Sequence, residues 1–285
     1  NRTIRVGGAT PSNSPTGGGV RFISDLRCVD ENIRQAGFGL ILAISNDKAE
    51  IEKQIMRSFI SERMEGVIIA PINQMNHQPQ YICELDKHGI PYVFVTAYYP
   101  QLEASYVMVD LEQGAFKLVR YLLELGHRNI FFIGGSADVI TTSRRIAGYK
   151  RAYHEKGLEV SERYLISCSR LNYEQAYDAV ERLIRSEHNI DAIFTINDMM
   201  ALAAINAIKS NGLNVPKDIS VAGYDDMIFS RISSIPITTV KQDVENMSRT
   251  AADMILRAIA KPVIEKEKRL ITPELIIRES TEQRR

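Results

Sequence analysis

Cysteine is scarce in this chain of 285 residues, which has three, at Cys28, Cys83 and Cys168. They are far apart and odd in number, and no CxxC pair occurs, so the sequence indicates neither a disulfide framework nor a zinc site. Free thiols are typical of a reducing compartment, which predicts a cytoplasmic protein. A chain of this length buries roughly three-quarters of the surface of its unfolded state, so its stability requires no disulfide or metal.

The sequence also lacks an excess of one charge and any long apolar run. The 35 basic and 35 acidic side chains cancel. This argues against a main nucleic-acid surface within these residues, because phosphate binding needs a positive excess. No stretch approaches the roughly 18 apolar residues of a membrane span, and no charged-then-apolar signal segment opens the chain. We expect no membrane partner. The abrupt opening NRTIRV is typical of a fragment or a mature chain, so the complete protein could have a further region ahead of Asn1.

Enzyme motifs are missing as well. The glycines at 7–8 and 17–19 do not fit GxGxxG, and GxxxxGK[ST] does not occur, so no nucleotide cofactor is expected. The stretch IGGSADV lacks the GxSxG elbow of hydrolases. The histidines show no HxxxH or HxH spacing that would hold a metal; they are His77, His88, His127, His154 and His188. We expect no catalytic residues, no cofactor and no metal.

Short apolar runs alternate with longer helical patterns almost throughout the chain. The first set predicts strands at 4–9, 40–44, 66–71 and 90–96, with helical segments at 25–37, 47–64 and 79–89 between them. The strands are nearly solid apolar runs, as expected where both faces of a sheet are covered. In the second helical segment the periodicity assigns Phe59 to the buried face and Glu52 to the solvent.

A second set follows the first. It predicts strands at 129–135, 164–169, 191–197 and 218–224, with helices at 112–125, 144–156 and 173–186 and one ending at 211. Alternation of this kind predicts βαβ units and parallel sheets. The fold class is therefore α/β, with two doubly wound parallel-sheet lobes joined by several crossovers.

The C-terminal tail is too short for a third domain. It predicts a strand at 237–243, a helix to about residue 260 and two short strands, RLIT and ELIIRES. We expect one of these two strands to return to each lobe. The predicted lobes are residues 1–109 plus 243–271 and residues 110–242 plus 272–285. A cleft between such lobes could close by hinge motion, with the Ser/Gly/Pro-rich segment 10–19 as a mobile lip.

Polar side chains follow the strands of the second predicted lobe. Arg145 stands near the start of a helix, Asn197 and Asp198 follow one strand, and Asp225 and Asp226 follow another. Open parallel sheets bind ligands beyond the carboxyl ends of their strands. Carboxylates accept hydrogen bonds from sugar hydroxyls, whereas a guanidinium and an amide donate to them, so the set suits a neutral polyol. The alternative is that Asp198 and Asp226 merely cap helices.

At these residues the chain resembles the effector-binding region of the lactose-repressor family, which has the type I periplasmic-binding fold. The matching stretches run in family order and are GVIIAP, VDLEQGAFKLVRYLLELGHRNIFFIGG, RRIAGYKRAY, AIFTINDMMALAAINAIKSNGLNVPKDISVAGYDDM, PITTVKQD and PELIIRES. The resemblance implies that Arg145 donates to ligand hydroxyls, that Asp225 accepts from them, and that Asn197 is a further sugar-contacting amide. Asp226 is left as a helix cap or a supporting group.

Further ligand contacts are implied at both lobes. Gln242 lies at the hinge beside the pocket, and Thr141 stands in the TTS stretch ahead of the arginines. From the first lobe, Phe22 matches an apolar wall residue, and Thr96 and Tyr98 lie at the end of the fourth strand. The chain departs from the family pattern at Leu171, where an aromatic residue is frequent, and in its longer glycine-rich segment before Phe22.

Within the family, GIPYVFVTAYYPQLEASYVMVD and TPELIIRES look like the arabinose repressors of Gram-positive bacteria, which carry a GntR-type winged helix. The resemblance implies a repressor of sugar utilisation that responds to a pentose such as L-arabinose. Its partners would be the sugar, a second copy in a homodimer, and operator DNA bound through an N-terminal domain absent from this chain. The alternatives are a secreted sugar-binding protein of a transporter and, from another class, an enzyme that uses the cleft.

Overall fold

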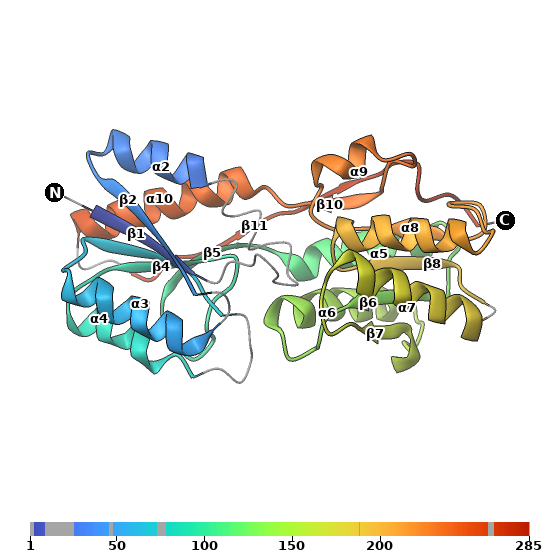
Figure 1. Cartoon of the computed structure of the whole chain (residues 1–285), viewed down its shortest axis with the longest axis horizontal. Coiled ribbons are helices and arrows are strands. Elements are labelled where there is room, and N and C mark those ends of the chain that lie inside the picture. The colour runs from blue at the N-terminus through green and yellow to red at the C-terminus, as the bar shows by residue number, and fades with distance from the viewer. Residues whose placement is uncertain are drawn as a thin grey trace. The chain divides into compact units, whose positions relative to one another are not determined.

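The computed structural model describes residues 3–8, 26–45, 48–72, 78–187, 189–261 and 265–284. The chain divides into two compact units, coloured by sequence position in Figure 1. Unit 1 consists of Asn1–Val109 and Asp243–Ile271, and unit 2 of Asp110–Gln242 and Thr272–Arg285. Among the described helices, none is both long enough and apolar enough to cross a membrane.

Unit 1 is built on a parallel sheet of six strands in the order β11-β5-β4-β3-β1-β2. The strands are β1 (Thr3–Gly8), β2 (Gly39–Ile44), β3 (Gly66–Ala70), β4 (Tyr92–Val95), β5 (Ser105–Val109) and β11 (Lys268–Ile271). Every residue of β3 and β4 is buried, as their solid apolar runs predict. The edge strand β2 differs from the prediction, since Ile41, Leu42 and Ile44 are each about two-fifths exposed.

Helices cover both faces of this sheet. They are α2 (Leu26–Gln35), α3 (Ala49–Ser61), the 3-10 turn η1 (Gln80–Ile82), α4 (Cys83–Lys87) and α10 (Val244–Ala260). Figure 1 shows α2 and α10 on one face and α3 and α4 on the other, and α10 contacts β3, β4, β5 and α2. A Cβ on Gly66 of β3 would lie 2.9 Å from Ile255 of α10, so helix and strand pack closely.

Glu52 of α3 is fully buried, so the prediction that it faces the solvent is wrong. Its carboxylate accepts hydrogen bonds from the Ile72 amide at 3.2 Å and from the hydroxyls of Tyr99 at 3.0 Å and Tyr81 at 2.5 Å. Helical periodicity cannot detect such partners, because they come from residues 20 or more positions away. These bonds tie α3 to the segments that follow β3 and β4.

Unit 2 contains a parallel sheet of four strands in the order β7-β6-β8-β9 and an antiparallel pair, β10 and β12. The strands are β6 (Ile130–Gly134), β7 (Leu165–Ser167), β8 (Ala192–Thr195), β9 (Ser220–Ala222), β10 (Thr239–Lys241) and β12 (Glu274–Ile276). Two isolated parallel bridges, Ala222 with Thr238 and Asp225 with Lys241, connect the end of β9 and the residues after it to β10 and the chain entering it. The parallel sheets of both units confirm the predicted α/β class.

The helices of unit 2 pack in pairs, α5 with α6 and α7 with α8. They are α5 (Leu111–Glu124), α6 (Ile140–Glu155), the 3-10 turn η2 (Glu162–Tyr164), α7 (Tyr173–Ser186), α8 (Asp198–Ser210) and α9 (Ile228–Ile232). At the α5–α6 contact, a Cβ on Gly148 would overlap the carbonyl oxygen of Glu112. Helix α6 begins at Ile140, four residues before the predicted start, so it contains Thr141 as well as Arg145.

The two short C-terminal strands join different units, as expected. Strand β11 pairs with β5 in unit 1, and β12, which begins three residues after β11 ends, pairs with β10 in unit 2. The chain passes from one unit to the other after Val109, after Gln242 and after Ile271. Neither unit is therefore a continuous stretch of sequence.

Candidate functional site

The strand order of unit 2 has a switch point between β6 and β8. From β6 the chain moves outward to β7 and then returns to β8 on the other side of β6. Ligands of open α/β sheets bind outside the carboxyl ends of the strands at such a point. The predicted site residues of unit 2 all follow strand ends: Thr141 and Arg145 follow β6, Leu171 follows β7, Asn197 follows β8, Asp225 follows β9 and Gln242 follows β10.

Arg145 and Asp225 lie next to each other in the interior of this site. Their side chains are 6% and 2% exposed, and Nη2 of Arg145 is 3.7 Å from Oδ1 of Asp225. This separation is too long for a hydrogen bond, so the attraction between the two groups is coulombic. Nη1 of Arg145 donates to the Thr141 carbonyl at 3.2 Å, and the guanidinium carbon lies 4.2 Å from the centre of the Tyr224 ring.

The guanidinium of Arg145 retains donor capacity. Its Nε–H is buried and has no hydrogen-bond partner among the described residues. A guanidinium has five N–H donors, and a buried donor without an acceptor costs about 1–3 kcal/mol. A ligand oxygen beside Nε would supply that acceptor, and a ligand hydroxyl near Nη2 could donate its proton to the Asp225 carboxylate.

Asp225 takes an uncommon backbone conformation, with φ at +110°. Its amide donates to the Val240 carbonyl at 2.8 Å, and Gln242 donates from its side-chain amide to Oδ1 of Asp225. Gln242 is itself 7% exposed. The structure therefore brings Thr141, Arg145, Asp225 and Gln242 into one connected group.

Asn197 is the N-cap of α8. Its side-chain oxygen accepts a hydrogen bond from the Met200 amide at 2.9 Å, and the residue is buried. The capping interpretation given to Asp198 is therefore wrong, since Asp198 is already the first residue of the helix. Capping uses the amide oxygen of Asn197, so the amide nitrogen is the group that could donate to a ligand.

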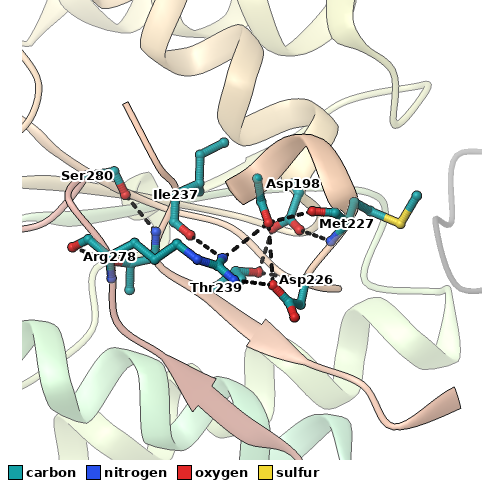
Figure 2. A network of polar contacts seen from close by, with 9 residues as sticks. Asp198, Asp226, Met227, Ile237, Thr239, Arg278 and Ser280 are labelled. Carbon is teal, nitrogen blue, oxygen red and sulfur yellow. Dashed lines mark hydrogen bonds and ion pairs between the residues drawn. The ribbon is translucent and has the colours of Figure 1, made fainter. Parts of the chain in front are cut away.

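Asp226 does not cap a helix either. The residue ahead of α9 is Met227, and Asp226 instead forms an ion pair with Arg278 at 2.5 Å (Figure 2). Arg278 and the Tyr224 ring beneath Arg145 were not among the predicted site residues. Both stand within stretches that carry the family resemblance, but nothing in the sequence pattern assigns them a partner.

Leu171, which follows β7, is buried, and its side chain lies beside Gly135 at the end of β6. If Gly135 carried a Cβ, that atom would lie 3.5 and 3.7 Å from the two methyl groups of Leu171 and 3.3 Å from the Thr142 hydroxyl. Thr142 is fully buried, and its hydroxyl has no hydrogen-bond partner within the described residues. Leu171 thus places an apolar side chain beside Gly135 and Thr142.

The remaining predicted contacts belong to unit 1 or lie outside the described residues. Thr96 directly follows β4 with φ at +66°, and Tyr98 stacks on Tyr106 with ring centres 4.3 Å apart. Phe22 and the segment 10–19 are outside the described residues. Within the described ranges, no cluster of three or more His, Cys, Asp or Glu side chains could hold a metal ion.

Comparisons with known proteins agree with this architecture. Residues 119–281 match the family described as periplasmic binding protein-like domain. The chain is 31% identical over 276 residues to the arabinose metabolism transcriptional repressor of Geobacillus stearothermophilus, covering 92% of this chain and 75% of that one. It is 30% identical over 251 residues to the HTH-type transcriptional regulator CelR of Thermobifida fusca, covering 87% of this chain and 72% of the relative.

Solved structures show the same fold. A complex of the transcriptional regulator CelR with cellobiose superposes with a TM-score of 0.85 at 26% identity, over 98% of this chain and 85% of that one. A regulatory protein of the LacI family from Chloroflexus aggregans gives a TM-score of 0.86 at 22% identity, with 98% of each chain covered. The chain therefore belongs to the LacI family of transcriptional regulators and spans the effector-binding domain, with its periplasmic binding protein-like fold.

Proposed function

We propose that this domain binds a small neutral sugar, most favourably a pentose such as L-arabinose, and thereby controls a repressor of sugar utilisation. The observation that supports this most directly is the buried pair of Arg145 and Asp225, 3.7 Å apart at a strand switch point. The names of two relatives, both arabinose metabolism repressors, favour the pentose. The cellobiose complex of CelR shows that a similar fold holds a sugar.

The chemistry of the pair suits hydroxyl groups better than charged ligands. A sugar hydroxyl donates one hydrogen bond and accepts others, so it can bridge Asp225 as acceptor and Arg145 as donor. The two opposite charges largely cancel, so the pair gives no net preference for an anion or a cation. A hydrogen bond to a charged group contributes about 1.5–3 kcal/mol, so each partner accounts for roughly a 10- to 150-fold change in affinity.

We propose that sugar acts by favouring one arrangement of the domain over another. A ligand shifts such an equilibrium only through its different affinities for the two states. The protein would act as a cytoplasmic homodimer that carries a DNA-binding domain for the operator, and not as an enzyme, as its relatives are transcriptional regulators. The GntR-type winged helix has no support in the names of the relatives. Several are called HTH-type regulators, which favours a helix-turn-helix.

The rival function is that of a secreted sugar-binding protein for a transporter, which would have the same two lobes. The relatives named above are regulators of transcription, so they favour the sensor. A sugar-binding measurement alone does not separate the two functions. The two functions are separated by testing whether the complete gene product binds operator DNA and whether the sugar weakens or strengthens that binding.

Isothermal titration with a panel of pentoses and hexoses tests the proposal. Arg145→Ala and Asp225→Ala should each weaken binding by roughly 10- to 150-fold. Arg151→Ala is the matched control, because Arg151 lies on the same helix but pairs with Glu112 at an exposed position; its affinity should equal that of the wild type. Absence of binding across the whole panel, or near-native affinity in either site variant, would show the assignment to be wrong.

A further inference from the structure

The turn that carries Asp225 is held in a left-handed conformation at two successive residues. The φ angles of Asp225 and Asp226 are +110° and +53°. Side chains other than glycine rarely adopt such angles, and they persist only where the surrounding structure enforces them. Some contact must therefore hold the segment from Tyr224 to Met227 in place.

Asp198 forms hydrogen bonds with both ends of this segment. Its amide donates to the Tyr224 carbonyl at 2.8 Å, and its Oδ2 accepts from the Met227 amide at 2.7 Å. Oδ1 bonds with the Thr239 hydroxyl at 2.5 Å (Figure 2). Asp198 is completely buried, and Gly223 leaves it room, because a Cβ there would overlap Oδ1 of Asp198.

Arg278 holds the same turn from the other side. Its Nη2 pairs with Asp226 at 2.5 Å, and its Nη1 donates to the Ile237 carbonyl at 2.8 Å and to the Ser230 hydroxyl at 3.2 Å. Figure 2 shows the guanidinium reaching from the segment after β12 toward Asp226. Arg278 thus joins the turn to α9, through Ser230, and to the chain that enters β10, through Ile237.

The amides of the turn are already used. Asp225 donates to the Val240 carbonyl at 2.8 Å, Asp226 to the Thr239 hydroxyl at 3.4 Å and Met227 to Asp198. The turn therefore presents a ligand with the carboxylate of Asp225 and not with backbone donors. The direction of that carboxylate depends on the backbone at Asp225, and so on the groups that hold the turn.

We propose that Asp198 and Arg278 are positioning residues, which hold the left-handed turn at Asp225 so that its carboxylate faces the effector. The part that concerns the effector rests on the proposed function, whereas the part that concerns the turn does not. Neither residue needs to touch the sugar.

The buried surroundings of Asp198 suggest a conservative substitution. Burial, with the nearby charge of Asp225, raises the pKa of Asp198 well above its usual value. Asp198 accepts from the Met227 amide and from the Thr239 hydroxyl, and a hydroxyl can also accept a hydrogen bond once its proton has rotated away. Asp198→Asn can make the same two bonds, because its amide has one acceptor oxygen and an NH2 donor. Asp198→Ala can make neither.

Amide hydrogen exchange measured by NMR on the ligand-free protein tests the proposal. In Asp198→Ala, exchange at Met227 should accelerate at least about tenfold relative to the amides of β9, as expected for the loss of one buried hydrogen bond. Asp198→Asn should stay near the wild-type rate. Arg278→Gln should accelerate exchange at Asp226, and it keeps the proposal testable if Asp198→Ala does not fold.

Asp191→Asn is the matched control for Asp198→Asn. Asp191 is also a buried acid of unit 2 that accepts from two backbone amides, those of Arg128 and Asn129. It precedes β8, whereas Asp198 follows that strand. Its substitution should leave the exchange rates at Asp226 and Met227 unchanged relative to β9.

Titration with L-arabinose on the same variants separates the two parts of the proposal. Asp198→Ala and Arg278→Gln should weaken binding by about tenfold or more, and Asp198→Asn should restore it. Unchanged exchange at the turn in both Asp198→Ala and Arg278→Gln would overturn the positioning role. Faster exchange with wild-type affinity would overturn the link to the effector. If exchange is faster in these variants but the wild-type protein binds no sugar of the panel, the proposed function is refuted, whereas the positioning of the turn by Asp198 and Arg278 is not.

Discussion

Replacing both charges of the Arg145–Asp225 pair should leave the ligand-free protein as stable as the wild type or more stable. The substitutions are Arg145→Met and Asp225→Asn together. Both side chains are almost wholly buried, yet they lie 3.7 Å apart without a hydrogen bond, and Nε of Arg145 has no acceptor among the described residues. Exchanging a buried ion pair for groups of similar volume is often neutral or stabilising by about 1–4 kcal/mol.

The structure sets an expected magnitude between neutrality and the middle of that range. The methionine removes a buried orphan donor, which costs about 1–3 kcal/mol in the wild type. The asparagine keeps an oxygen for the hydrogen bond from Gln242 and tolerates a positive φ. We therefore expect a gain of about 0–3 kcal/mol in the free energy of unfolding, with sugar binding lost. Asp225→Ala alone should instead cost about 3–5 kcal/mol, because it leaves the guanidinium buried without its counter-charge.

Urea unfolding of ligand-free protein, followed by circular dichroism, measures these changes. A shift of the midpoint without a change of slope reports stability alone. If the double variant loses more than about 1 kcal/mol of unfolding free energy, the reasoning is refuted. The ion pair would then stabilise the fold, whereas a preorganised ligand site is expected to destabilise it.

Two further changes test the packing and the electrostatics of unit 2. Gly148→Ala should lower the free energy of unfolding by about 3 kcal/mol or more, because its Cβ would overlap the backbone of α5 at Glu112, which cannot move aside as a side chain could. Thermal unfolding measures this change. A much smaller loss of unfolding free energy would contradict the close contact between the two helices. Burial lowers the pKa of His127 below its usual 6.5, so the stability it contributes is present above about pH 6.5 and is lost as the pH falls through the lowered pKa. His127→Gln should therefore reduce the loss of unfolding free energy between about pH 7 and pH 5, measured by urea titration at both values.

The order and type of most elements could be predicted from the sequence, because apolar strands and amphipathic helices differ in periodicity and glycines end several helices. Strand β5 was missed, since its serine and tyrosine weaken the apolar pattern of Ser105–Val109. The exposure of β2 also escaped prediction, because the apolar run GLILAI does not show that the strand lies at a sheet edge.

At the site, the strand-end argument predicted the proximity of Arg145 and Asp225, because the carboxyl ends of parallel strands meet at one edge. The helix-capping alternative for Asp198 and Asp226 was wrong, because a capping pattern is local whereas their partners Thr239 and Arg278 lie 41 and 52 residues away. The other alternative for Asp226, a supporting group, agrees with its ion pair to Arg278. Buried acids gain partners of this kind only after the chain has folded. The solvent-facing assignment of Glu52 failed for the same reason.

The interleaving of the two units has a consequence for synthesis on the ribosome. Helix α10 and strand β11 complete unit 1, yet they are translated only after nearly all of unit 2. At about 5–20 residues per second, the first 109 residues wait on the order of ten seconds for the helix that covers β3, β4 and β5. During that interval the nascent sheet exposes an apolar face and the open edge of β5, which is where a chaperone would be expected to engage the growing chain.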